Sequence, residues 1–162
     1  MFERELKIYA LMLDYLQRLV ADLDDEQIAK QPSPGINTPL WILGHLAIST
    51  DFAAQMLGGG SRCPKEWIEQ YGPKSKPVSD QQPRPTKAEL VAAIEAGHHM
   101  VTELAKSANE EAMRQPHPLQ IGVLQDFCPT VGDLVSHLLT SHPGIHSGQL
   151  SAWRRQMGLP PA

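Results

Sequence analysis

The chain has 162 residues, 41% of them hydrophobic, and its 14 Lys and Arg against 18 Asp and Glu give a net charge of −4 at pH 7. This length suits a single domain over residues 1–162, and no apolar run reaches the roughly 18 residues that a membrane span needs. The chain is acidic and has no cluster of Lys and Arg of the kind that binds nucleic acid. Its N-terminus lacks the unbroken apolar stretch of a signal peptide. We therefore expect a cytoplasmic protein without nucleic-acid or membrane partners.

Apolar residues at spacings of three and four predict a first helix from Phe2 to about Leu23. A second helix is predicted from Thr38, a good N-cap, with Pro39 in the first helical position, and it ends at the glycines 58–60. Its inward positions are predicted at Trp41, His45, Ile48, Phe52 and Met56.

The third helix is expected to begin with a capping box in which Thr86 pairs with Glu89. The fourth is expected to run as one helix from near Thr130, its N-cap, to Gly158, with Asp133 in the first turn, where the helix dipole favours a negative charge. Its inward stripe is predicted at Leu134, Val135, Leu138, His142, Gln149 and Trp153.

No segment shows the strict alternation of a strand, so the sequence predicts an all-α fold, a four-helix bundle with long, proline-rich connections. The connection 58–85 is long enough to cross the bundle, which would let the second and third helices run parallel. Short helices are expected within the connections, at 63–70 and 109–115.

Three histidines stand on the predicted inward stripes. His142 and His146 are four residues apart and share a helix face, about 5–6 Å apart at Cβ, so both rings can reach one ion at a distance of about 2.0–2.1 Å. His45 lies on the apolar stripe of the second helix, and a buried imidazole needs a hydrogen bond or a metal. Together they predict a three-histidine site with open positions, which is typical of a catalytic metal.

Other interpretations stay open at this point. Taken alone, His45 is more often a core histidine satisfied by a hydrogen bond, and many pairs such as His142 and His146 lie at a surface. His137 precedes His142 by five residues, about 140° away on a continuous helix, so it is not favoured as a ligand.

Further polar residues on the predicted helices are candidates for supporting roles. His98, near the inward stripe of the third helix, is a candidate fourth ligand or a group that orients a ligand. Gln149, one turn after His146, is placed to hold a metal-bound water or to orient an imidazole. His99 and His117 are expected to be solvated.

Pro143 and Gly144 fall between the two histidines of the fourth helix. Inside a helix, the proline removes the amide hydrogen that would bond to the carbonyl of Leu139 and costs about 3 kcal/mol or more, and the glycine adds about 1 kcal/mol against alanine. Two interpretations are open: a kink that aims the two rings, or a kink that only serves packing.

The stretches "TPLWILGHLA" and "HPGIHSGQLSAWRRQMGL" resemble the DinB-like (DinB/YfiT) superfamily of bacterial four-helix bundles, and the similarity covers nearly the whole chain. The resemblance implies a bundle with long crossover connections, often a homodimer. It also implies one divalent ion, nickel or zinc and less commonly manganese, held by His45, His142 and His146, with Gln149 in a structural or orienting role. Pro143 departs from the family pattern, and a displaced His142 ring would distort the site.

Relatives in this family include enzymes that use low-molecular-weight thiols, among them bacillithiol transferases and mycothiol-dependent isomerases, and metal-dependent hydrolases. The first hypothesis is therefore an enzyme whose metal lowers the pKa of a small thiol for transfer or of water for hydrolysis. In that case Arg154 or Arg155 could meet a carboxylate of the thiol, although a solvated surface pair is the expected default for adjacent arginines.

The second hypothesis is a non-enzymatic, stress-related helical bundle. It would act through dimerisation or partner binding, with the metal tying the second and fourth helices together. A closed site with His98, Cys63 or Cys128 as fourth ligand would favour it, whereas an open position beside a pocket would favour the enzyme.

Overall fold

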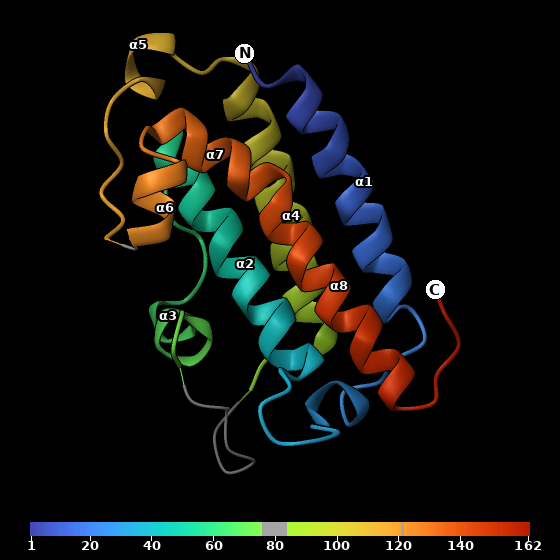
Figure 1. Ribbon diagram of the computed structural model, residues 1–162. Helices are drawn as coiled ribbons and strands as arrows, with labels where there is room; N and C mark the ends of the chain where they lie inside the picture. Colours follow the sequence, from blue (N-terminus) through green and yellow to red (C-terminus); the bar gives the residue numbers. More distant parts are fainter. Residues whose placement is uncertain (76–83, 121) are drawn as a thin grey trace.

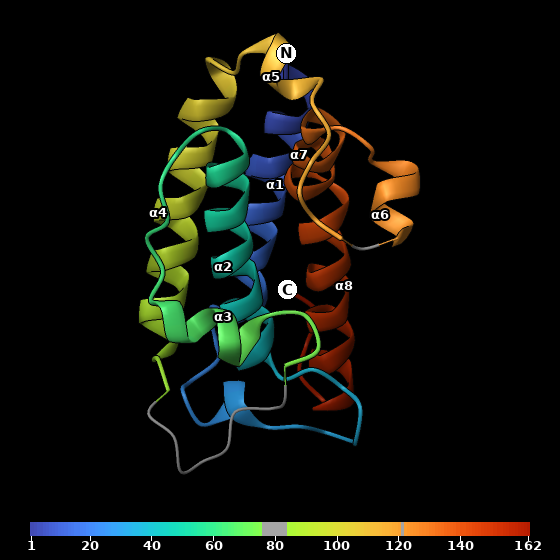
Figure 2. The ribbon, with the colours of Figure 1, turned by 90° about the vertical axis from the view of Figure 1, so that its left-hand side faces the viewer.

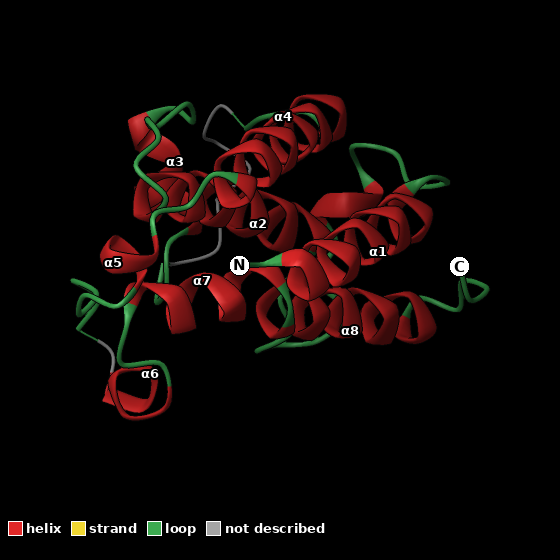
Figure 3. Cartoon of the chain, turned by 90° about the horizontal axis from the view of Figure 1, so that it is seen from above, coloured by secondary structure: helices red, strands yellow, loops and turns green. Residues whose placement is uncertain are grey.

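The computed structural model describes residues 1–75, 84–120 and 122–162, and these residues form a bundle of four long helical segments (Figure 1). The segments are α1 (Glu3–Val20), α2 (Pro39–Met56), α4 (Lys87–Lys106) and a last one made of α7 (Val131–Leu139) and α8 (Ser141–Gln156). The view from above shows helices and loops but no strand among the described residues (Figure 3). Pro116 and Thr130 form an isolated antiparallel bridge. The all-α prediction is confirmed.

The chain direction follows from the long connection between α2 and α4. Both of these helices run in the same direction, and α1 and α8 run the opposite way (Figure 1). The close approach of Gly97 to Thr50, and of Leu104 to Gly59 near the later ends of both helices, agrees with this direction. The predicted parallel arrangement of α2 and α4 is therefore confirmed.

Shorter helices lie in the connections. The predicted segment at 63–70 overlaps α3 (Lys65–Tyr71), and the one at 109–115 contains α5 (Glu110–Met113). The 3-10 turn η1 (Gln27–Ala29) and α6 (Gly122–Phe127) were not predicted. Residues 76–83 of the connection between α2 and α4, and residue 121, lie outside the described residues. Helices α3 and α6 both lie on the outer side of the bundle, next to α2 and α7 respectively (Figure 2).

The predicted N-caps are present. The Thr38 hydroxyl accepts a hydrogen bond from the Trp41 amide at 3.1 Å. Thr86 with Glu89, and Thr130 with Asp133, form reciprocal capping boxes. At the other end of α2, Gly58 has a φ of +86°, and Gly59 donates to the Ala54 carbonyl at 2.8 Å. These contacts satisfy backbone groups that a helix end leaves unpaired.

Helix α2 is apolar on every side and is buried between α3, α4, α7 and α8. The stripe predicted to face the core is, apart from His45, the less buried side of this helix. Trp41, Ile48, Phe52 and Met56 do pack against the core, as predicted, but the deepest burial lies on other faces because a helix surrounded by others has no single inward stripe. The most deeply buried residues of α2 are Ile42, Leu43, Ala47, Ala53 and Ala54.

The fourth predicted helix is divided into two helices in the structure. It breaks at Thr140, where φ is −127° and ψ is −83°, and α8 begins at the next residue. Pro143 is therefore the third residue of a new helix, in the first turn, where a backbone amide has no intrahelical acceptor. The expected penalty for a proline inside a helix does not arise, and the Gly144 amide continues the pattern by donating to the Thr140 carbonyl at 3.2 Å.

None of the helices in the described part of the chain has an apolar stretch long enough to cross a bilayer.

Candidate metal centre

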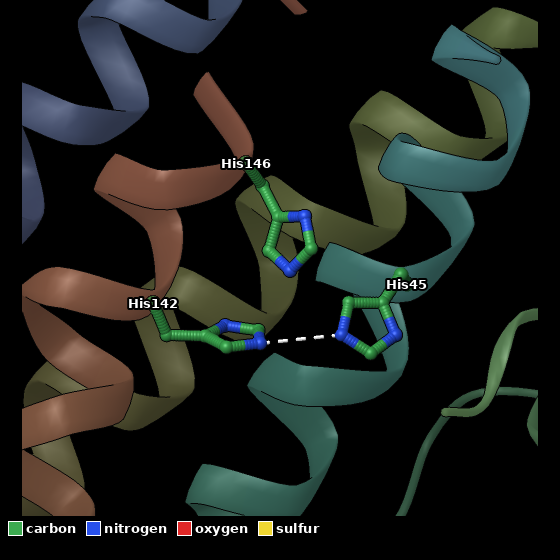
Figure 4. Close-up of side chains that lie close together, drawn as sticks. All are labelled: His45, His142 and His146. Carbon is green, nitrogen blue, oxygen red and sulfur yellow. Dashed lines mark hydrogen bonds between the residues drawn. The ribbon is translucent and has the colours of Figure 1, made fainter. Parts of the chain in front are cut away.

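The three predicted histidines come together in the middle of the bundle. His45 extends from α2, and His142 and His146 extend from α8 towards it (Figure 4). One ring nitrogen of each lies within 4.8 Å of one ring nitrogen of the others. His45 and His146 are buried, and His142 is half-buried. The chain therefore contains a buried three-histidine cluster that could hold a metal ion.

Two of the three rings are oriented by hydrogen-bond acceptors outside the cluster. Nδ1 of His45 donates to the backbone carbonyl of Tyr71 at 2.8 Å, and Nδ1 of His146 donates to Oε1 of Gln149 at 3.1 Å. Because a carbonyl oxygen only accepts, Nδ1 carries the proton in both neutral rings, and each Nε2 has a free lone pair. Such outer contacts commonly hold metal-ligating histidines in one tautomer.

His142 completes the cluster. Its Nε2 lies 3.2 Å from Nε2 of His45 (Figure 4). Since Nε2 of His45 has no proton, Nε2–H of His142 donates to it in the metal-free protein. The displacement of the His142 ring that Pro143 was expected to threaten is not observed, because the proline sits in the first turn of α8.

The cluster is held in the uncharged form. Burial lowers the pKa of His142 to about 2 and that of His146 to about 4, and repulsion among the neighbouring imidazoles adds to this. Burial also lowers the pKa of His45. Neutral imidazole is the form that ligates metals, so protons do not compete for these nitrogens near pH 7.

The donor set fits a borderline transition-metal ion. Within the described residues, the cluster consists of three imidazoles and includes no carboxylate or thiol. Imidazole suits zinc and nickel, whereas manganese favours oxygen donors. Three protein ligands leave at least one coordination position for another molecule.

The residues around His45 explain the W-x-x-G-H spacing at the start of α2. The Trp41 ring stacks on the His45 ring, with centroids 4.7 Å apart and planes 7° apart. A Cβ on Gly44 would lie 2.3 Å from the Tyr71 ring, so only glycine lets this fully buried tyrosine pack on the α2 backbone. Tyr71 was not identified from the sequence, because it is brought to His45 only by the fold of α3 against α2.

His98 is not part of the cluster. Its ring stacks on the Tyr9 ring at a centroid distance of 4.1 Å, and His98 and His142 both line a small cavity of about 30 Å³. The structure thus does not place His98 as a fourth ligand. Gln149 was predicted on the inward stripe but is exposed; its Oε1 nevertheless accepts the hydrogen bond from Nδ1 of His146.

His137 and His117 differ from expectation. The break at Thr140 turns α7 relative to α8, so the His137 ring lies against the His142 ring at a centroid distance of 5.6 Å instead of on a distant face. His137 remains outside the cluster. His117, expected to be solvated, is buried, and its Nδ1 accepts from the Leu119 amide at 3.1 Å. His99 is exposed as predicted.

The expectation of a solvated arginine pair is wrong for Arg154. Its guanidinium is buried, donates from Nη2 to Oδ2 of Asp22 at 2.9 Å and binds the backbone carbonyls of Leu19 and Pro160. All these contacts are within the chain, so Arg154 anchors the C-terminal segment to α1. Arg155 is exposed.

Neither cysteine joins the cluster. Cys63 and Cys128 are both free and half-buried. Burial, together with the neighbouring Asp51, raises the pKa of the Cys63 thiol to about 12, so this sulfur is protonated and unreactive at neutral pH. The described residues thus give no support to a closed site with a cysteine as fourth ligand.

A cavity of about 350 Å³ opens beside the cluster, with His45 and His142 among its lining residues. This volume lies within the range of about 300–1,000 Å³ that is typical of small-molecule sites. The side of the cluster that faces the cavity is therefore accessible to a ligand of modest size.

The sequence model of the DinB superfamily matches residues 9–150, a range that includes the three histidines and Gln149. The fold is similar to that of a crystal structure described as a conserved protein from Enterococcus faecalis. That structure is 16% identical in sequence, the match covers 98% of each chain, and the TM-score is 0.72; the likeness shows a shared fold. No curated protein sequence matches the chain.

Proposed function

The chain belongs to the DinB superfamily, and we propose that it binds one divalent transition-metal ion through His45, His142 and His146 and uses it in thiol transfer or in hydrolysis. The observation that carries this proposal is the convergence of three neutral imidazoles at the edge of a ligand-sized cavity. Nickel and zinc fit the all-nitrogen donor set better than manganese does.

When bound, such an ion supplies a Lewis acid that lowers the pKa of a small thiol or of water, and so provides a nucleophile near neutral pH. The residues of the protein hold the ion and orient its ligands. Tyr71 and Gln149 keep Nδ1 protonated in two of the rings and direct their Nε2 atoms inward. The apolar cavity walls limit access of bulk water to the reacting groups.

The histidines are ligands in this proposal and not general bases, since a ring nitrogen cannot bind a metal and a proton at once. Cys63, although it lines the cavity, is not the nucleophile, because its thiol remains protonated. The reacting thiol or water therefore comes from solution. This assignment leaves both transfer and hydrolysis as reactions to be tested.

The enzyme hypothesis is favoured over a purely structural metal because the cluster has three ligands and a cavity beside it. In the structural alternative, the ion would only join α2 to α8. A cytoplasmic homodimer remains part of the proposal, supported by the family resemblance. Exposed Ile8 and Leu11 on α1 and Ile145 on the neighbouring α8 are apolar residues available to such an interface.

The decisive experiment is elemental analysis of protein purified without a metal-affinity tag. We expect about one transition-metal ion per chain in the wild type and loss of that ion in His142→Ala, with helical content by circular dichroism largely unchanged. His99→Ala, which removes an exposed histidine, is the matched control and should keep the metal. The site assignment is wrong if alanine at each of the three histidines leaves the metal content unchanged, or if the wild type takes up no added nickel, zinc or manganese.

A further inference from the structure

The cavity beside the histidines has an unequal distribution of polarity. Its walls are mainly apolar and come from α2, the loop that follows it, α3, the residues around α6, α7 and the start of α8. His45 and His142 are part of this lining, so a ligand inside can present a donor atom to the histidine cluster. The apolar side chains that carry the argument are Ile48, Phe52, Ile68, Leu119, Leu124 and Leu134.

The lining of the cavity includes a buried carboxylate. Among the described residues that line it there is no lysine or arginine, and Asp51 is the charged one. Asp51 is buried, with 4% of its surface exposed. Its Oδ2 accepts hydrogen bonds from Oγ of Ser61 at 2.8 Å and from the amides of Arg62 and Cys63 at 2.6 Å each.

These donors satisfy the Asp51 carboxylate without neutralising it, because each is an uncharged hydroxyl or amide group. The wall of the cavity therefore carries a negative charge in a place largely shielded from water. An anionic ligand would lose its hydration there and meet a like charge, without a lining cation as a partner. A neutral ligand has neither disadvantage.

The remaining hydroxyls of the lining are engaged by the protein itself. Oγ of Ser49 donates to the His45 carbonyl at 2.6 Å, and Oγ of Ser61 donates to Asp51. Their donor capacity is thus used within the chain, and contact with a ligand would come mostly from the apolar side chains. Such a lining selects for apolar surface on the ligand.

From these observations we infer that the cavity accepts an uncharged, largely apolar molecule with a metal-binding donor at one end, and that Asp51 discriminates against ligands that carry carboxylates. This inference rests on the proposed function for the metal end of the cavity. Under it, a thiol rich in carboxylates is disfavoured inside the cavity, and an aryl or alkyl thiol of similar size is favoured.

The test uses two ligands of similar size, 4-methylbenzenethiol and 4-mercaptobenzoate, which differ in a methyl group against a carboxylate. Their affinities are measured on the cobalt-substituted protein from the visible absorption of the ion. We expect the methyl compound to bind at least about 10-fold more tightly. In Asp51→Asn, whose amide oxygen can accept the same hydrogen bonds, the ratio of the two affinities should fall to within about threefold. Asp126 is an exposed residue of α6 outside the lining, so Asp126→Asn should keep the wild-type ratio.

A second pair of variants keeps the inference testable if Asp51→Asn does not fold. Leu124→Asp adds a charge to the cavity wall from α6, and Val123→Asp adds it to the neighbouring residue, which is 62% exposed and does not line the cavity. The first should weaken binding of 4-methylbenzenethiol by at least about 10-fold, and the second should leave it unchanged. Equal or tighter binding of 4-mercaptobenzoate to the wild type, or an unchanged ratio in a folded Asp51→Asn, would overturn the inference.

Failure of the proposed function is recognised separately. If the protein takes up no cobalt, nickel or zinc, the metal proposal fails, and the preference of the cavity is then measured on the metal-free protein with toluene and benzoate. Shifts of leucine methyl resonances with toluene alone would support the apolar selectivity. Shifts of equal size with benzoate would contradict it.

Discussion

The backbone carbonyl of Tyr71 accepts a 2.8 Å hydrogen bond from Nδ1 of His45, across 26 residues of sequence. This contact exists because the Tyr71 ring packs directly on the α2 backbone at Gly44, the residue before the histidine. The glycine thus determines how closely α3 approaches α2, and through Tyr71 it determines the orientation of His45.

Gly44→Ala should therefore weaken metal binding even though the residue carries no ligand. The new Cβ would lie 2.3 Å from the Tyr71 ring, so the ring and its carbonyl must move away from His45. We expect affinity for zinc or nickel, measured by chelator competition, to fall by about 10-fold or more, and the free energy of unfolding to fall by about 1–3 kcal/mol. Gly148→Ala, a helical glycine on α8 with no heavy atom near its added Cβ, should bind metal normally; wild-type affinity in Gly44→Ala would refute the role of Tyr71.

Gln149 is predicted to support the metal from outside the cluster. Gln149→Ala removes the acceptor of the His146 Nδ1 proton, so the ring is no longer held in one tautomer, and metal affinity should fall by about 10- to 100-fold. Gln149→Glu retains an acceptor oxygen and should bind close to the wild-type level. Gln156→Ala, also exposed on α8, serves as the control, and an affinity loss of the same size in that variant would show that the effect is not specific to His146.

Arg154 is predicted to stabilise the fold without taking part in ligand binding. Arg154→Leu leaves the carbonyls of Leu19 and Pro160 without their donor and Asp22 without its partner, and the free energy of unfolding should fall by about 1–3 kcal/mol. Arg155→Ala, which alters an exposed residue, should change it by no more than about 0.5 kcal/mol. Urea unfolding measures both, and metal content should be unchanged. Loss of thiol binding in an otherwise stable Arg154→Leu would contradict this assignment.

The metal-free protein should lose stability as the pH falls below about 6.5. Burial lowers the pKa of His142 to about 2 and that of His146 to about 4 in the folded chain, whereas an unfolded histidine titrates near its ordinary pKa of about 6.5. Between these values the unfolded state binds more protons, so the free energy of unfolding decreases with falling pH, by up to about 1.4 kcal/mol per pH unit for each histidine. Urea unfolding at pH 7.5, 6 and 5 with a chelator present tests this.

The matched variant for the pH dependence is His142→Ala, which should show a shallower decrease over the same interval because one buried titrating group is gone. A stability that stays constant from pH 7.5 to 5 in the wild type would show that the three imidazoles are protonated normally in the folded protein. Added zinc or nickel should stabilise the wild type at pH 7 by binding only the folded state.

Much of the helical framework could be predicted because its signals are local. The caps at Thr38, Thr86 and Thr130 depend on residues three positions away, and Gly58 ends α2 through its own positive φ. The common face of His142 and His146 follows from the helical repeat, which remains valid because the break at Thr140 lies before both residues.

What only the tertiary structure decided concerns residues that meet across long sequence separations. The distance from His45 to His142, the burial of Arg154 against Asp22, and the position of Asp51 in a cavity wall all depend on how whole helices pack. The break at Thr140 was also not predictable from the sequence, because it lies three residues before Pro143, the residue at which a kink was expected. The sequence by itself determined which residues could bind a metal, because helical periodicity and the chemistry of imidazole are local properties. Packing between distant segments decided which nitrogens face one another, because the neighbours of a buried side chain come from segments that are far away in the sequence.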